Sequence, residues 1–189
     1  MGIPTLIKTL TASSDSSLSF VHGTADVIFD STYDEYMFVF TDIGPESDAY
    51  NFAFQVSIDG GSNYNVTCTS ASFDARHTEE GDGESLAYQT AQDQAQGTAL
   101  QSLGWNIGNE ADSSSAGILH IFNPASTTYV KHFYGRSTSY TNDGGGSDGG
   151  CNDGFIAGYF NDADDDLNAI TFKMTNGDFD GVIQMYGIA

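Results

Sequence analysis

The sequence is poor in basic residues: five Lys and Arg stand against 26 Asp and Glu, which gives a formal net charge of -21. Binding to a nucleic-acid backbone requires several Lys or Arg side chains to neutralise phosphates, and the few present here are scattered along the chain. An anionic membrane surface is disfavoured for the same reason. We therefore expect no nucleic acid and no membrane among the partners. The acidic surface favours solubility and makes copies of the chain repel one another.

Long apolar runs and export signals are also missing. No run approaches the ~20 residues that a membrane-spanning helix needs. No N-terminal stretch combines a basic region, an apolar region and a small-residue cleavage site. We therefore expect synthesis in the cytoplasm without a signal peptide.

Cysteine is scarce. The two cysteines, Cys68 and Cys151, form no CxxC pair, which excludes a zinc knuckle. Cys68 lies in the alternating run YNVTCTS and Cys151 in a glycine-rich stretch. A disulfide between them would require an oxidising compartment. The missing export signal favours free thiols, and the sequence leaves their bonding open.

Catalytic motifs are absent as well. The sequence contains no P-loop, no HExxH and no G-x-G-x-x-G that opens a helix. One G-x-S-x-G match, residues 145–149 with Ser147 at its centre, lies in a glycine run, and no histidine follows it. We attribute this match to the local composition, and we predict that the chain is not an enzyme and has no catalytic residues.

The chain does contain many aromatic residues in alternating patterns. Thirteen Phe and ten Tyr occur, and segments such as YMFVFTDI and YNFAFQVSI show the period of two that is typical of half-buried strands. Turn residues such as Gly44-Pro45 and Asp59-Gly60-Gly61 separate them. Since the strands are short and no βαβ alternation is visible, we predict an all-β fold: a single antiparallel β-sandwich of jelly-roll type over residues 1–189.

Three segments carry more specific expectations. Residues 79–115 form an irregular region of strands or covering loop, and residues 141–154 form a flexible glycine-rich loop. Residues 170–189 read as a closing hairpin with an Asn-Gly turn. Because first and last strands commonly lie close in a jelly roll, we expect the segment TLIKTLT beside the last strand.

An acidic run near the C-terminus suggests calcium, because hard cations bind several carboxylate oxygens. The run does not fit an EF-hand, since Leu167 and Lys173 stand where that loop needs Gly and Glu. A looser site that uses loop carboxylates such as Asp143, Asp148 and Asp153 stays open, as does a simple solvated acidic turn. We predict no required cofactor, with calcium as the one ion to consider. The metal candidates are Asp162, Asp164, Asp165 and Asp166.

Histidines and aromatic residues offer two further hypotheses. His120 and His132 fall in consecutive predicted strands, where we expect both on one face, but two histidines without a third ligand are ordinary sheet residues rather than a metal site. Aromatic residues near loops are a familiar way to bind sugar, although most aromatic side chains are expected to fill the core. The glycan-binding candidates are Trp105, Tyr134 and Tyr140.

Four segments together show a resemblance to known proteins: GIPTLIKTLTASSDSSLSF, FQVSIDGGSNYNVT, AGILHIFNPASTTYVKHF and GVIQMYGI. With the glycine-rich loop and the acidic run excepted, the similarity spans nearly the whole chain. The segments resemble small β-rich, virion-type proteins encoded by marine tailed bacteriophages. The pattern includes no catalytic residues.

This resemblance implies a non-enzymatic structural protein of the virion: a surface-displayed capsid decoration, fibre or knob, or a tail-associated subunit. Its expected partners are other virion proteins and further copies of itself. A homo-oligomer is expected, with a trimer favoured. The alternative is a lectin-like module that binds a receptor or a host-surface glycan, with calcium as an assisting ion.

Overall fold

The computed structural model describes residues 2–81, 83–142, 149–162 and 164–189. Within these ranges the chain forms twelve β-strands, and no helix there has the length and hydropathy needed to cross a membrane. The strands are β1 (Thr5–Asp15), β2 (Leu18–Val21), β3 (Glu35–Pro45), β4 (Tyr50–Ser57), β5 (Cys68–Thr78), β6 (Ser85–Tyr88), β7 (Gln101–Ile107), β8 (Ser115–Phe122), β9 (Lys131–Asn142), β10 (Gly149–Phe160), β11 (Ala169–Met174) and β12 (Phe179–Ile188).

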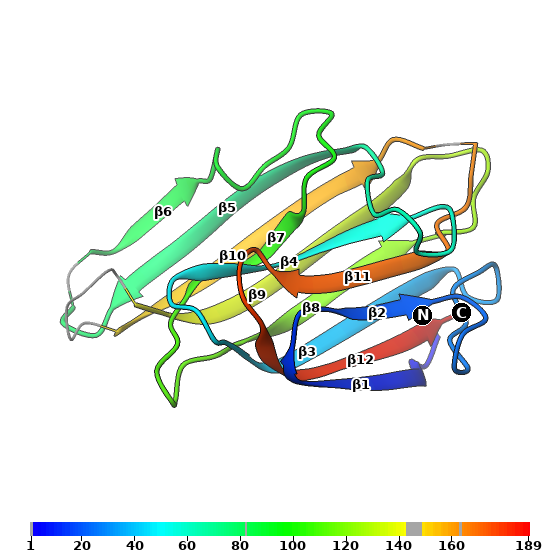
Figure 1. The fold of residues 1–189 in the computed structure, drawn as a ribbon. Coiled ribbons are helices and arrows are strands. Elements are labelled where there is room, and N and C mark those ends of the chain that lie inside the picture. The colour runs from blue at the N-terminus through cyan, green and yellow to red at the C-terminus, as the bar shows by residue number, and fades with distance from the viewer. Residues whose placement is uncertain (1, 82, 143–148, 163) are drawn as a thin grey trace.

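The strands form two antiparallel layers that pack face to face (Figure 1). The smaller sheet has the order β2-β11-β4-β7, and the larger sheet has the order β1-β12-β3-β8-β9-β10-β5-β6. A single pairing of Ile107 with Thr141 connects the two at β7 and β9. Strands that follow one another in the chain, such as β1 and β2 or β3 and β4, lie in opposite sheets. This alternation confirms the predicted jelly-roll sandwich.

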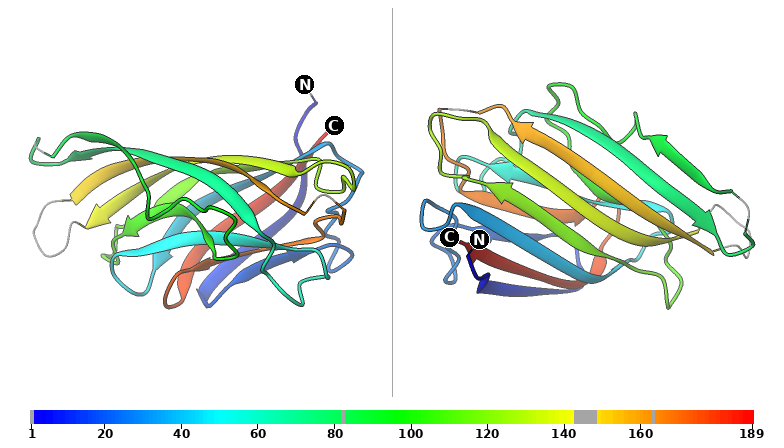
Figure 2. Two further views of the ribbon diagram at one scale, coloured as in Figure 1. Left: turned by 90° about the horizontal axis from the view of Figure 1, so that it is seen from above. Right: turned by 180° about the vertical axis from the view of Figure 1, so that it is seen from behind.

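The larger sheet continues past the jelly roll. Its strands β1, β12, β3 and β8, together with the smaller sheet, make up what we call the jelly-roll half. Strands β9, β10, β5 and β6 prolong the larger sheet beyond β8, and we call them the extension. The right-hand view in Figure 2 looks onto the outer side of the larger sheet, where the extension lies beside β8. The extension comes from two separate stretches of chain, 68–88 and 131–160.

Phenylalanine rings fill the space between the layers of the jelly-roll half. The ring centroid of Phe172 lies 5.4 Å from that of Phe38, 5.9 Å from Phe52 and 6.2 Å from Phe20. All four side chains are fully buried. Burying one such side chain contributes roughly 1.5–3 kcal/mol, and tilted or edge-to-face ring pairs add to this. The alternating Phe residues seen in the sequence therefore form the core.

The C-terminal segment joins the two sheets. β1 pairs with β12, with Leu10 opposite Ile183, so the predicted neighbour of the last strand is confirmed. The predicted hairpin is wrong, because β11 pairs with β2 and β4 whereas β12 pairs with β1 and β3. The turn at Gly177, where φ is +76°, carries the chain across the core. Ile170 and Ile183 are fully buried from opposite layers, as a jelly roll requires of consecutive strands.

The predicted loop 141–154 is largely strand where the structure describes it. Thr141 and residue 142 end β9, residues 149–154 begin β10, and residues 143–148 lie outside the described residues. Gly154 has a packing role: a Cβ atom there would lie 2.0 Å from the Trp105 ring. This glycine lets the indole lie against the backbone of β10, so its position reflects close approach rather than chain flexibility.

The region 79–115 contains two strands, β6 and β7. Residues 89–100 run between them and hydrogen-bond to the start of β5: the Cys68 amide donates to the Gly97 carbonyl at 2.7 Å, and the Ser70 amide donates to the Gln94 carbonyl at 2.9 Å. β7 is almost entirely buried. The sequence of β7, QSLGWNI, lacks a clear alternation because both of its faces are covered.

Candidate functional site

The predicted glycan-binding residues separate into two groups. Trp105 is only 3% exposed and packs against β10 in the interior, so its ring cannot form part of a surface binding platform. This overturns its assignment as a sugar-contacting residue: it lies on a strand that is covered on both faces. Tyr134 and Tyr140 instead lie on β9 with their side chains on the outer side of the larger sheet.

The acidic run is organised around a lysine. The Lys131 side chain is fully buried, and its Nζ donates hydrogen bonds to the backbone carbonyls of Asp162 and Asp165. Burial lowers the pKa of Lys131, while the surrounding aspartates, Asp162 first, act in the opposite direction. The ammonium group therefore sits inside the turn formed by the acidic run and ties it to the first residue of β9.

The carboxylates proposed for calcium do not come together to form a cation site in the described ranges. Within the described residues, no three His, Cys, Asp or Glu side chains are grouped so that they could hold a metal ion, and this includes Asp162, Asp164, Asp165 and Asp166. Of the looser candidates, Asp153 binds Arg136. Asp143, Asp148 and the Ser147 of the G-x-S-x-G match lie outside the described residues.

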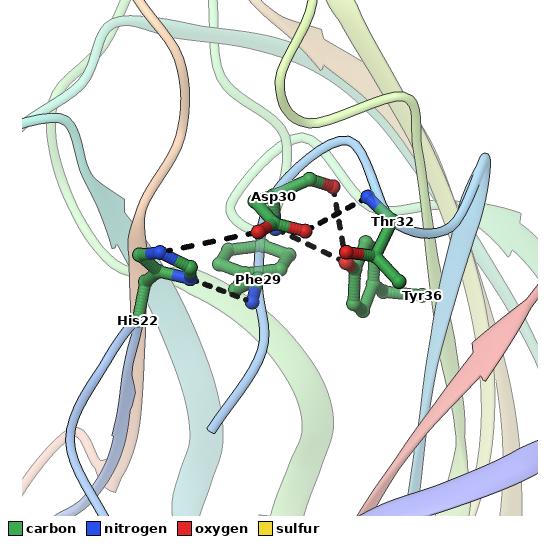
Figure 3. A network of polar contacts seen from close by, with 5 residues as sticks. All are labelled: His22, Phe29, Asp30, Thr32 and Tyr36. Atoms are coloured by element: carbon green, nitrogen blue, oxygen red, sulfur yellow. Dashed lines mark hydrogen bonds and ion pairs between the residues drawn. The ribbon is translucent and has the colours of Figure 1, made fainter. Parts of the chain in front are cut away.

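A polar network lies in the loop between β2 and β3 (Figure 3). The Phe29 amide donates to His22 Nδ1 at 3.2 Å, and His22 Nε2 lies 4.0 Å from Asp30 Oδ2. The Thr32 amide donates to Asp30 Oδ1 at 2.8 Å. The pKa of Asp30 is lowered, first by the hydrogen bond from the Thr32 side chain and less by this amide. The Tyr36 hydroxyl bonds to the backbone of Asp30, and burial raises its pKa to about 12. These contacts are all made among residues of the loop region and the start of β3, so the network holds the loop against β3.

The outer side of the extension and of β8 forms a large surface rich in aromatic residues, which we call the aromatic face. Strand alternation places every second side chain there. The outward residues are Ala116, Ile118, His120 and Phe122 of β8; His132, Tyr134, Arg136, Thr138 and Tyr140 of β9; Cys151, Asp153, Phe155, Ala157 and Tyr159 of β10; Thr69, Ala71, Phe73, Ala75 and His77 of β5; and Leu86 and Tyr88 of β6. Four large hydrophobic side chains among them are exposed: Leu86 (76%), Tyr88 (55%), Tyr134 (45%) and Phe73 (43%).

A ridge of side chains crosses this face at right angles to the strands. Strand register sets Ile118, Arg136, Phe155, Phe73 and Tyr88 directly opposite one another in that order. The Phe73 and Phe155 rings stack with centroids 4.8 Å apart and planes at 5°. The Arg136 guanidinium lies 4.7 Å above the Phe155 ring centre. Such stacking and cation–π contacts hold the rings in fixed positions.

Arg136 also forms the ion pair of this face. Its Nε and Nη2 donate to Asp153 Oδ1 at 2.9 Å and Oδ2 at 2.7 Å, a bidentate arrangement. At neutral pH these two residues are the fully charged side chains among the outward residues named above. These outward residues thus balance in charge, although the whole chain carries -21. Two further carboxylates lie at the edges of the face: Glu35 of β3, which bonds to His120, and Glu79.

An apolar hollow lies beside the ridge. It has a volume of about 340 Å³, and Ala71 and Ala157 lie opposite each other at its base, next to Phe73 and Tyr134. On its far side, Tyr134 stacks on His120 with ring centroids 4.6 Å apart. The small side chains of Ala71 and Ala157 lie next to the large side chains of the ridge, so the surface of the face is uneven.

A second, more polar hollow of about 580 Å³ lies at the other end of the face. It is lined by His77 and Glu79 from β5 and the turn after it, and by Thr138, Tyr140 and Cys151. The Glu79 carboxylate raises the pKa of the Tyr140 phenol. Hydroxyl, imidazole and carboxylate groups thus line one concave surface together.

The inner side of the extension is polar where Trp105 and residues 89–100 cover it. Asp74 is buried and accepts hydrogen bonds from Gln89 Nε2 and Asn152 Nδ2, both at 2.6 Å. Ser137 and Ser139 of β9 are also buried. This part of the extension therefore turns polar groups inward and aromatic groups outward, whereas at its other end Phe133 and Phe160 point into the core. Sequence reasoning missed Phe73, Phe155 and Arg136, because a period of two shows that side chains alternate without showing which side faces the core.

The two cysteines lie far apart and are free. In the β5–β10 register Cys68 is opposite Phe160, whereas Cys151 is opposite His77, nine positions further along β5. At ~3.3 Å per residue this separates them by roughly 30 Å, which rules out a bond within one chain. Cys151 is exposed on the aromatic face, and burial raises the pKa of Cys68 to about 12.

A scan against protein-family models finds no match, and searches of curated proteins and of solved structures find no significant match either.

Proposed function

We propose that this chain is a non-enzymatic structural subunit of a tailed-bacteriophage virion, displayed on the capsid or associated with the tail, and that it assembles through its aromatic face. The observation that carries this proposal is the combination of exposed aromatic residues and few charged residues on one face of a strongly acidic protein. Large exposed apolar patches on soluble proteins mark interaction sites. The resemblance of four segments to small phage proteins is the reason for proposing a phage virion as the assembly.

The jelly-roll fold supports this proposal by analogy. Jelly rolls occur in viral capsid proteins, and also in lectins and cupins, so the fold limits the function without deciding it. In this proposal the subunit is made in the host cytoplasm and then joins other virion proteins.

The direct test is the protein content of purified particles. We expect mass spectrometry of gradient-purified virions to recover the chain in stoichiometric amounts, and an electron-microscopy map of the particle to contain its sandwich. Recovery from the infected-cell lysate but not from the particles would contradict the proposal.

The polar hollow next to Tyr140 favours a second candidate, a receptor- or glycan-binding module. Its His77, Glu79 and Thr138 side chains can exchange hydrogen bonds with sugar hydroxyls, and Tyr134 lies on the same face. The measurement is a glycan screen of the native protein, of Tyr140→Ala and of Tyr129→Ala, an exposed tyrosine outside this face, each with calcium and with EDTA. Binding that only Tyr140→Ala abolishes would support the candidate, and uniform absence of binding would exclude it. A loss in EDTA would show that calcium assists.

A further inference from the structure

The polarity of one end of the extension, around Asp74, is inverted relative to the rest of the sandwich. Its inner side buries Asp74 and Asn152 in a hydrogen-bonded cluster, whereas Phe73, Tyr134 and Tyr88 lie exposed on its outer side. Within one chain the aromatic side chains of this face therefore gain little from burial. A second layer packed on the outer side would supply that burial, at roughly 25 cal/mol for each Å² of apolar surface covered.

The charges on this face indicate what kind of layer fits. A basic partner would be drawn to the acidic remainder of the surface, where most of the 26 carboxylates lie. Among its outward strand residues the aromatic face offers such a partner the carboxylate of Asp153, which Arg136 already neutralises. The further carboxylates lie at its edges: Glu35, which bonds to His120, and Glu79 in the polar hollow. A strongly acidic partner can pack closely only where the surface has few carboxylates, because like charges must not face each other at close range. Another copy of this chain is such a partner.

The composition and relief of the face agree with packing on itself. Interface centres are enriched in Tyr, Phe and Arg and poor in Lys, Glu and Asp, and this face has that composition. The Phe73–Phe155 ridge and the hollow over Ala71 and Ala157 lie side by side. A two-fold rotation sets the ridge of each copy over the hollow of the other, which is the self-complementary contact of a symmetric pair.

We infer that the aromatic face binds a second copy of this chain, so that two sandwiches pair around a two-fold axis through their extensions. The inference rests on the proposed assembly function, because it names the partner of the same face. The pair brings together two copies of charge -21, so its stability depends on how far salt screens their mutual repulsion. The Debye length falls from about 30 Å at ~0.01 M to about 8 Å at ~0.15 M salt. Pairing therefore strengthens as salt is added, whereas binding to a basic partner would weaken.

The experiment is sedimentation velocity of the purified chain over a range of protein concentrations and at both ionic strengths. We expect a monomer–dimer equilibrium that shifts towards dimer with added salt. Tyr134→Asp, which puts a carboxylate beside the apolar hollow, should weaken pairing by about tenfold or more. Tyr129→Asp makes the same change at an exposed tyrosine in the loop after β8, outside the face, and should leave pairing unchanged apart from the added charge. Circular dichroism identifies any variant that has failed to fold.

A chemical label gives a second measurement that needs no substitution. Cys151 is exposed on the aromatic face and Cys68 is buried, so a bulky maleimide should modify Cys151 alone in the folded protein. We expect the label to prevent pairing, and we expect Cys151 to react more slowly at protein concentrations where the pair forms.

Four results would overturn the inference: a monomer under all conditions, pairing that weakens with salt, pairing of Tyr134→Asp equal to that of Tyr129→Asp, or a trimer. A trimer counts against it because a single face packed on itself closes with two copies. The two proposals can fail separately. A monomeric chain found in purified virions would contradict only the two-fold pair, and a pair formed by a chain absent from virions would contradict only the virion function.

Discussion

In the jelly-roll half, Phe38 and Phe172 point between the sheets, whereas in the extension Phe73 and Phe155 point away from them and Asp74 points inward. Both regions are built from strands with the same period of two, and they share the larger sheet. The jelly-roll half has a second apolar layer across its core, which stabilises it from within. The inner side of the extension is covered by β7, by residues 89–100 and by β4, whose Phe54 packs on Phe133 and Phe160. Its outer side has only its own stacked side chains. The extension is therefore a surface supported by the core of the jelly-roll half and has no separate core of its own.

The largest expected effect comes from removing one phenylalanine in each region. Phe172→Ala empties a site that is surrounded by rings and should lower the free energy of unfolding by about 3–5 kcal/mol. Phe73→Ala removes a half-exposed stacked ring and should cost about 1 kcal/mol. Urea unfolding of both variants, at protein concentrations where the native chain is monomeric, measures the contrast. Equal losses would show that the extension has a core of its own.

A smaller loss is expected at the junction of the two regions, where β9 begins. Lys131→Met removes the buried ammonium and leaves the carbonyls of Asp162 and Asp165 without its hydrogen bonds. Losing a charged donor to two partly buried carbonyls should destabilise the protein by about 1–3 kcal/mol. Lys173→Met, at a half-buried lysine on β11, is the matched control and should stay within about 0.5 kcal/mol. Comparable losses in chemical denaturation would argue against an organising role for Lys131.

A pH-dependent effect is expected at the turn that leads from β4 in the jelly-roll half to β5 in the extension. Asp59 accepts hydrogen bonds from the Asn63 side chain at 2.6 Å, the Asn63 amide at 2.9 Å and the Ser57 hydroxyl at 2.7 Å. Led by the Asn63 side chain, these donors lower the pKa of Asp59 from 3.8 to about 2. Because the folded pKa lies below the unfolded one, the ionised carboxylate stabilises the fold above pH 3.8, and this contribution is lost as the pH falls towards 2.

The free energy of unfolding, measured over a series of pH values, checks the direction of this change. The stability difference between the native chain and Asp59→Asn should be largest at neutral pH and should shrink below pH 3.8. A difference that stays constant down to pH 2 would contradict the lowered pKa.

The smallest expected effect is chemical and leaves the fold unchanged. Cys68 lies on the inner side of β5 with its pKa raised to about 12, whereas Cys151 lies on the outer side of β10. Ellman's reagent should therefore titrate one thiol in the folded protein and two in urea. Cys151→Ser should remove the reactive thiol of the folded state, and Cys68→Ser should not. Two reactive thiols before unfolding would mean that the inner side of the extension is open to solvent.

The fold was predictable from the sequence because alternating Phe, Val and Ile segments separated by Gly-, Pro- and Asn-containing turns favour a sandwich. The position of TLIKTLT beside the last strand was predictable too, since it follows from jelly-roll connectivity. The crossing at Gly177 was missed, because an Asn-Gly turn also closes hairpins and local turn chemistry does not say in which sheet the next strand lies.

The candidate site was less predictable. In SASFDARH and GFIAGYF the alternation is clear, but the usual rule of apolar inside would have turned Phe73 inward and Asp74 outward. The structure has them reversed, because Gln89, Asn152 and Trp105 occupy the inner side. Of the three glycan-binding candidates, Tyr134 and Tyr140 lie on the outer side of the sheet and Trp105 is buried. Glycan binding by the two tyrosines stays a prediction. The role of Lys131 was not predictable, because it depends on a contact with Asp162, 31 positions further along the chain, and local sequence patterns do not show such contacts.

The contact between Trp105 and Gly154 also gives the chain an optical reporter. Trp105 is the single tryptophan, it belongs to β7 of the jelly-roll half, and its ring lies on the backbone of β10 in the extension. An indole in such a dry environment emits at short wavelength, and water reaching it shifts the emission to the red. The intrinsic fluorescence of the unmodified protein therefore follows the seam between its two halves, and it can register the extension lifting away before the jelly roll itself unfolds.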